Sequence, residues 1–198
     1  MKGIFKLKPS LSKYTGIYDA DLVIRYLMTI NNDTAKLKEF SQKLLMLLLL
    51  ITSQRSQSMA SIDIRTIHEC ETLGVIDIFI PDVLKTTKPG RHLLPMRLQI
   101  YTPDPNICPV ATLKLYLAKT KSIRTDNQLF VSYIQPHRGV KSTTLSRWAK
   151  ETLKAAGVDI TTFSAHSTRA ASTSKMMAMN ISTEDIRKVG IVDIRSVL

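Results

Sequence analysis

One uninterrupted apolar run, Leu44 to Ile51, constrains this chain more than any other feature of its sequence. A helix that crosses a bilayer needs about 20 such residues, so this run of eight is too short to span one. It continues a helical pattern that starts after Asn32-Asp33-Thr34, residues of the kind that cap a helix N-terminus. Because its apolar side chains cover every face, the run predicts a helix that other elements bury on all sides.

The segments around this helix indicate a mixed fold. Residues 1–17 are basic and contain Pro9 and Gly16, which favours an extended arm, and residues 19–28 predict a short helix with Leu22, Tyr26 and Leu27 on one side. Alternating or β-branched stretches predict three antiparallel strands over 62–67, 75–80 and 91–98, joined by turns at Thr72-Leu73-Gly74 and at 86–90. Later segments predict helices over 109–119, 142–156, 165–179 and from 182 onward. The expected class is α+β, mostly α, with a small three-stranded antiparallel sheet packed among helices.

The charge of the chain points to a polyanionic partner. Its 198 residues carry 28 Lys and Arg against 16 Asp and Glu, a formal net charge of +12, which suits nucleic acid or an acidic membrane face. No stretch pairs a strongly basic face with an apolar one, and the N-terminus lacks the apolar core of a signal peptide, so we expect no membrane association. Cys70 and Cys108 have neither disulfide-framework nor zinc-site spacing, and we expect no metal.

Three groups of residues could carry chemistry. His166 and Arg169 are three apart in a predicted helix, so both side chains can reach one phosphate. Arg55 follows the buried helix, where an unpaired guanidinium is costly, and Lys85 either ends the strand that starts at Val75 or begins the loop after it. Each group also has an alternative interpretation. HxxR is a common string that can occur by chance, Arg55 can be a structural arginine with a partner, and Lys85 can belong to a solvent-exposed hairpin. Neither a P-loop nor a GxGxxG or GxSxG motif is present.

Taken in order, these elements resemble the catalytic domain of the tyrosine recombinases, the phage-integrase family. The similarity covers about residues 35–190 and looks closest to recombinases of DIRS-like and Crypton-like mobile elements. It is carried by three strings: Thr52-Ser53-Gln54-Arg55, residues 84–92 with Lys85 and Lys88, and residues 165–174 with the HxxR motif. The resemblance divides the chain into an arm or linker over residues 1–34 and a catalytic-type domain over 35–198.

The resemblance implies DNA strand exchange through a covalent 3′-phosphotyrosine, with double-stranded DNA as partner and no cofactor. By this resemblance Arg55 and Arg169 clamp the scissile phosphate, His166 assists proton transfer, and Lys85 is the general acid, with Lys88 as the alternative. Guanidinium groups suit the negative charge that a phosphoryl transition state gains. The residues expected to contact DNA outside these are Lys88, Arg91, His92, Arg147 and Lys150.

The chain departs from the family pattern at its C-terminal end. Ile191 stands where the family has His or Trp, and all six tyrosines precede His166, so the nucleophile slot is not filled. Ser58 stands where the family often has an acid. We therefore expect a truncated domain whose family acts in DNA integration and recombination, but which cannot cleave DNA alone. We also expect weakened homo-oligomer formation on DNA and a nuclear location. The alternatives are a DNA-binding remnant without catalysis and a basic helical domain that binds RNA or protein.

Overall fold

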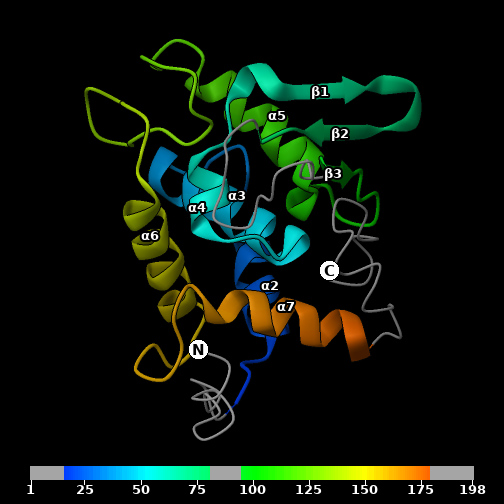
Figure 1. Cartoon of the computed structure of the whole chain (residues 1–198), viewed down its shortest axis with the longest axis vertical. Helices are drawn as coiled ribbons and strands as arrows, with labels where there is room; N and C mark the ends of the chain where they lie inside the picture. Colours follow the sequence, from blue (N-terminus) through cyan, green and yellow to red (C-terminus); the bar gives the residue numbers. More distant parts are fainter. Residues whose placement is uncertain (1–15, 81–94, 179–198) are drawn as a thin grey trace, which may run out of the picture.

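The computed structural model describes residues 16–80 and 95–178, and it confirms a mostly helical α+β architecture with one three-stranded antiparallel sheet. Figure 1 shows the sheet at one end of the molecule, α7 across the other end, and α3 and α4 between them. The helices and strands, in chain order, are α2 (Ala20–Thr29), α3 (Leu37–Thr52), α4 (Ser56–Ala60), β1 (Ile67–Cys70), β2 (Val75–Ile78), β3 (Met96–Gln99), α5 (Pro109–Thr120), α6 (Ser142–Ala155) and α7 (Ser167–Ala178).

Helix α3 is the centre of the core. Every residue from Phe40 to Thr52 except Gln42 is buried, and α5, α6 and α7 all pack against this helix. Its predicted start was wrong: the Oδ1 atom of Asn31 accepts hydrogen bonds from the N–H groups of Asp33 and Thr34, so these residues form a turn before the helix. The predicted burial of the apolar run on all sides is confirmed.

Helix α2 lies where a short helix was predicted, but its buried face differs from the predicted one. Val23, Ile24 and Leu27 enter the core, whereas Leu22 is 38% exposed. These side chains join the same hydrophobic cluster as α3, and an ion pair between Asp21 and Lys175 links α2 to α7. Helix α2, which lies within residues 1–34, therefore packs against and supports α7, the helix that carries Arg169 of the HxxR motif.

The sheet has the strand order β1-β2-β3, with both pairs antiparallel. Its first strand begins at Ile67 rather than at residue 62, because Asp63 instead caps a short 3-10 turn, η1 (Ile64–Thr66), by accepting from the N–H of Arg65. The predicted turn before β2 is confirmed, with Gly74 in the left-handed conformation at φ +61°. Opposite Asp77, Arg97 forms two hydrogen bonds of 2.7 Å with its carboxylate, so the charge of Arg97 is neutralised within the sheet.

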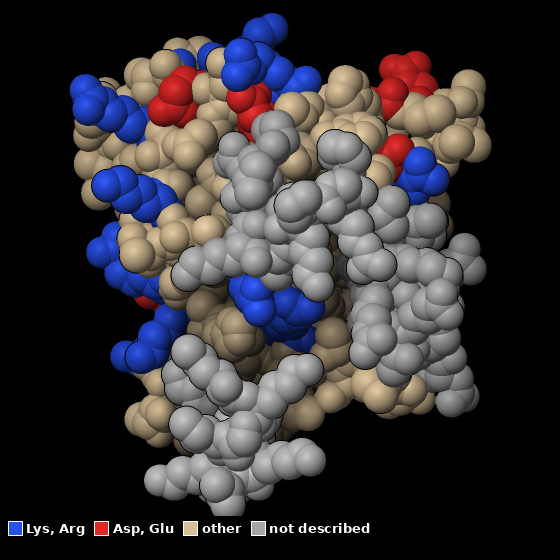
Figure 2. All heavy atoms as spheres, in the orientation of Figure 1, with Lys and Arg blue, Asp and Glu red and all other residues tan. Residues whose placement is uncertain are grey.

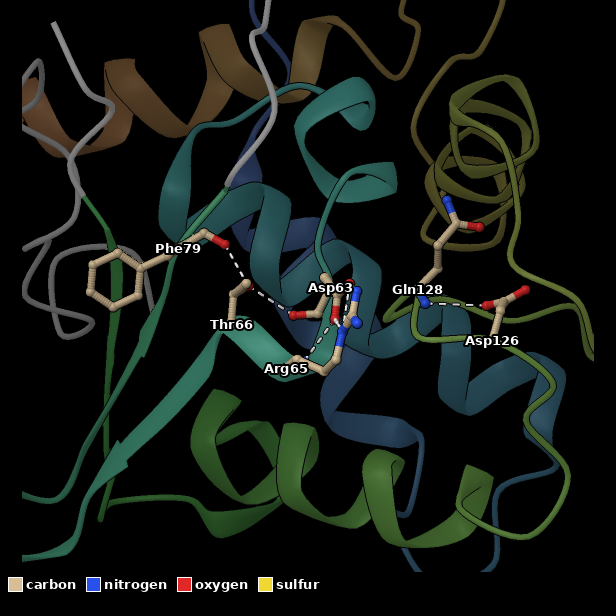
Figure 3. Close-up of polar contacts among 6 residues, drawn as sticks. All are labelled: Asp63, Arg65, Thr66, Phe79, Asp126 and Gln128. Carbon is tan, nitrogen blue, oxygen red and sulfur yellow. Dashed lines mark hydrogen bonds and ion pairs between the residues drawn. The ribbon is translucent and has the colours of Figure 1, made fainter.

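A loop between α5 and α6 is held against the segment that leads into β1. Figure 3 shows Asp63 and Arg65 paired, Thr66 bonded to the carbonyl of Phe79, and Gln128 bonded to Asp126. The segments that contain Asp63 and Gln128 join through an antiparallel bridge between these two residues. Within residues 16–80 and 95–178, no helix combines the length and the apolar character that crossing a membrane requires.

A lysine is buried at the contact between α2 and α3. Lys43 has no exposed surface, and its Nζ atom donates a 2.5 Å hydrogen bond to the carbonyl of Ile30, which ends α2. Burial lowers the pKa of Lys43 to about 8, against the smaller opposing effect of the Asp104 carboxylate. The ammonium form is therefore disfavoured in the folded chain relative to the unfolded one.

This burial predicts a pH dependence of stability. Between the folded pKa of about 8 and the ordinary value of 10.5, the unfolded chain binds more protons at Lys43, so stability rises with pH in this window. Relative to Lys43→Met, the free energy of unfolding of the wild type should gain about 1–3 kcal/mol from the lower to the upper limit, measured by urea denaturation. The control is Lys38→Met, since Lys38 lies exposed on the same helix. Parallel pH profiles of wild type and Lys43→Met would contradict the prediction.

Candidate functional site

The end of α3 places Arg55. The helix ends at Thr52, and Ser53 follows in the left-handed conformation with φ 49°, which turns the chain sharply toward α4. The Thr52 hydroxyl secures this turn, because it donates to the carbonyl of Leu48 (2.6 Å) and accepts from the N–H of Gln54 (3.3 Å). Arg55 then caps α4 with its backbone. Arg55 lies three residues after the C-terminal end of α3. The C-terminal end of a helix is the negative end of its dipole, which favours a nearby cation.

The start of α7 places His166 and Arg169. A reciprocal pair secures it: the N–H of Ser164 donates to Oγ of Ser167 (3.0 Å), and the N–H of Ser167 donates to the carbonyl of Ser164 (2.9 Å). The helix begins at Ser167, so the prediction that His166 lies within it was wrong. His166 occupies the preceding turn, at the positive end of the helix dipole.

The structure brings three sequence-predicted residues together. Arg55, His166 and Arg169 line one hollow of about 170 Å³ between α4, α6 and the start of α7. The other residues that line it, which the sequence did not single out as site residues, are Gln54, Ser56, Gln57, Ser142, Ser146 and Ala165. The spacing of Ser142 and Ser146, one turn apart on α6, is the sequence signal that could have found them.

The hollow is strongly electropositive. Among the described residues that line it there is no Asp or Glu, and within residues 16–80 and 95–178 neither Arg55 nor Arg169 forms an ion pair with a carboxylate. Burial lowers the pKa of Arg169, and the charge of nearby Arg55 lowers it further. Two guanidinium groups that repel each other beside a helix N-terminus form a site for an anion, and a guanidinium fork matches a phosphate.

Ser58 fills the position where the resemblance suggests an acid. It is 5% exposed, and its hydroxyl donates to the side-chain oxygen of Gln54 at 3.2 Å. It adds no negative charge beside Arg55, so nothing at this position offsets the repulsion between the two arginines.

Helix α6 carries basic side chains beside the hollow. Arg147 and Lys150 are both exposed, as predicted for DNA contacts, and Lys150 has no ion pair within the described part of the chain. Arg147 lies 3.9 Å from Glu151, but that carboxylate already accepts a 2.7 Å hydrogen bond from Gln42. Figure 2 shows Lys and Arg side chains along the side of the molecule where α6 runs, with others near the centre of this face.

Some predicted site residues fall outside the described ranges. These are Lys85, Lys88, Arg91 and His92 between β2 and β3, and Ile191 near the C-terminus. Across residues 16–80 and 95–178, the structure contains no group of three or more His, Cys, Asp or Glu side chains placed to bind a metal ion.

Solved structures with this fold are recombinases. XerA recombinase matches with a TM-score of 0.62 and 15% identity over 96% of this chain and 61% of its own. XerH site-specific recombinase matches with a TM-score of 0.65 and 14% identity over 96% of this chain and 51% of its own, so the present chain spans little more than half the length of these two proteins. The catalytic core of lambda integrase matches with a TM-score of 0.51 and 18% identity, over 87% of this chain and 93% of its own.

These similarities show the fold. The chain has the architecture of tyrosine recombinase catalytic domains, as the resemblance predicted. No protein-family model and no curated protein matches the sequence.

The repulsion between Arg55 and Arg169 predicts how the hollow responds to anions. In dilute buffer, where the screening length is about 30 Å at 0.01 M salt, Arg169→Gln should melt at or above the wild-type temperature because one of two unpaired like charges is removed. Added inorganic phosphate should raise the melting temperature of the wild type more than that of Arg169→Gln, because bound ligand stabilises the folded state. Equal shifts in both proteins would show that the hollow does not bind the anion.

Proposed function

We propose that this chain binds double-stranded DNA and holds one backbone phosphate between Arg55 and Arg169, as a domain of the tyrosine recombinase family that serves in DNA recombination and integration. The observation that carries the proposal is the meeting of two arginines, distant in sequence, in one hollow whose described lining has no carboxylate. The fold supports it, because solved structures with the same architecture are recombinases.

The proposed chemistry is the phosphoryl transfer of the recombinase family, in which a tyrosine hydroxyl attacks the phosphorus and the 5′-oxygen of the DNA leaves. The described residues of this chain would supply the groups that stabilise this step, but not the attacking tyrosine. Both guanidinium groups would stabilise the negative charge that develops on the non-bridging oxygens of the phosphate. His166, at the start of α7, would donate a hydrogen bond or a proton to the same group. Lys85 is the proposed general acid toward the leaving oxygen, with Lys88 as the alternative.

DNA would extend from the hollow along α6. The same helix supplies Ser142 and Ser146 to the hollow and carries Arg147 and Lys150 on its exposed side. A DNA strand seated in the hollow would therefore meet further positive charge in the direction of this helix. XerH is seen bound to its difH substrate, and lambda integrase as a tetramer on a Holliday junction. By analogy we propose duplex DNA as the partner and assembly of several copies on it.

A second candidate function is DNA binding without strand cleavage. Among the five tyrosines that the structure describes, none lines the hollow. Tyr116, for example, is fully buried, and its phenolic oxygen accepts a hydrogen bond from the N–H of Val131. Tyr14 lies outside the described residues. This arrangement favours a domain that binds a phosphate but has no nucleophilic tyrosine at the hollow among its described residues.

The phosphate clamp predicts a specific pattern of duplex binding. Arg55→Ala and Arg169→Ala should each weaken the affinity for duplex DNA by about 10- to 100-fold, the range for losing a hydrogen bond to a charged group. Each should also reduce the slope of log affinity against log salt by about one, because one phosphate contact is lost. Fluorescence anisotropy across a salt series measures both quantities.

The matched control for this series is Arg65→Ala. Arg65 is an exposed arginine of equal charge, but its guanidinium is held by Asp63 away from the hollow. Arg65→Ala should leave affinity and salt slope close to those of the wild type. If Arg55→Ala and Arg169→Ala behave like this control, the hollow does not bind DNA phosphate.

The position of the tyrosines predicts the outcome of a trapping experiment. When the chain is incubated with a nicked suicide substrate, which traps a covalent 3′-phosphotyrosine, no adduct should form, because no described tyrosine faces the hollow. Denaturing electrophoresis and mass spectrometry detect such an adduct. A trapped adduct at any of the six tyrosines would disprove the second candidate function and establish strand cleavage.

A further inference from the structure

Two buried serines connect the chain segments that carry Arg55 and Arg169. Ser53 is 5% exposed and Ser172 is fully buried, and their Oγ atoms lie 2.9 Å apart. The Ser172 hydroxyl also donates to the carbonyl of Leu50. Since a serine hydroxyl carries a single proton, the Ser172 proton points to Leu50 and the Ser53 hydroxyl must donate to Ser172. The direction of both hydrogen bonds follows from this count.

These hydrogen bonds join α3 to α7 beside the hollow. The carbonyl of Leu50 belongs to the last turn of α3, where carbonyl groups have no partner within the helix, so Ser172 satisfies one of them. Ser172 lies nearly one helical turn after Arg169 on α7, and Ser53 lies two residues before Arg55. The chain of hydroxyls therefore connects the two backbones close to the point where each arginine leaves its backbone.

The backbone of Ser53 makes this serine unusual. It adopts φ 49° and ψ 23°, a left-handed conformation that is unfavourable for a residue with a Cβ atom and free of strain for glycine. The turn after α3 could therefore be made more easily by glycine. What glycine could not supply is the hydroxyl that reaches Ser172.

We propose that Ser53 and Ser172 are positioning residues that hold the guanidinium groups of Arg55 and Arg169 at the spacing which binds a DNA phosphate. The inference rests on the proposed function. Two like charges in one hollow repel each other, so an untethered α3–α7 contact would relax by moving the arginines apart. A pair of buried hydrogen bonds across this contact opposes that movement and presents both guanidinium groups to one ligand.

The test separates positioning from folding. Ser53→Gly suits the left-handed backbone but lacks the hydroxyl, so its melting temperature should equal or exceed that of the wild type. Its affinity for a short duplex should nevertheless fall about 3- to 10-fold, the range expected for one lost hydrogen bond. Ser172→Ala should lose at least as much affinity. The matched control is Ser41→Ala, because Ser41 is a fully buried serine of α3 whose hydroxyl donates to Leu37 of its own helix and also interacts with Tyr116 of α5, and neither partner lines the hollow.

A double-mutant cycle with Arg55→Ala decides between the explanations. If the serines act through the arginines, Ser53→Gly should cause little further loss of duplex affinity once Arg55 is alanine. Full additivity, or wild-type affinity of Ser53→Gly, overturns the positioning role while the weakened binding of Arg55→Ala still supports the proposed function. If Arg55→Ala and Arg169→Ala themselves bind like the wild type, both the proposed function and the positioning role are overturned.

Discussion

The structure depends on the burial of the C-terminal part of α3, from Lys43 to Thr52. Because the run from Leu44 to Ile51 is apolar on all sides, it is stable only when covered, and α5, α6 and α7 supply that cover. Packing at this density leaves little freedom for a covered helix to shift. The end of α3 is thereby held in place, and Arg55, three residues beyond it, starts from a fixed point.

Two positive charges without a carboxylate partner in the described part of the chain meet at the hollow. Several basic side chains elsewhere have partners: Arg65 pairs with Asp63, Arg97 with Asp77, and Lys175 with Asp21. At the hollow, Arg55 and Arg169 lie close enough for their charges to interact, with no carboxylate among the described lining residues. Surface ion pairs contribute little to stability, but they remove charge from the field that an approaching polyanion meets. The net positive charge of +12 is therefore distributed unevenly over the surface. Positive charge that the described acidic side chains do not neutralise lies at the hollow and along the exposed side of α6.

Sequence reasoning succeeded where a single local signal dominates. The helices predicted over 109–119 and 142–156 are confirmed: Pro109 begins α5, and Gly157, with φ +85°, follows α6. It failed where local signals compete. The Asn-rich segment before α3 forms a turn because an Asn side chain can bond to backbone N–H groups outside a helix as readily as at its start. The alternating pattern around Ile64 predicted a strand. Instead, the carboxylate of Asp63 accepts a hydrogen bond from the N–H of Arg65 and caps the 3-10 turn over Ile64–Thr66, so β1 begins only at Ile67.

The sequence by itself determined the buried helix, the class of the fold and the excess of positive charge, and its resemblance to the recombinases singled out Arg55, His166 and Arg169 as phosphate-binding candidates. These conclusions follow from periodicity, composition, residue chemistry and the family resemblance, all of which can be read along the chain. Only the tertiary structure decided that the two arginines share one hollow, that Ser142 and Ser146 line it, and that Ser53 bonds to Ser172. Contacts between residues far apart in sequence depend on how helices pack, and side-chain packing is set by the whole core at once.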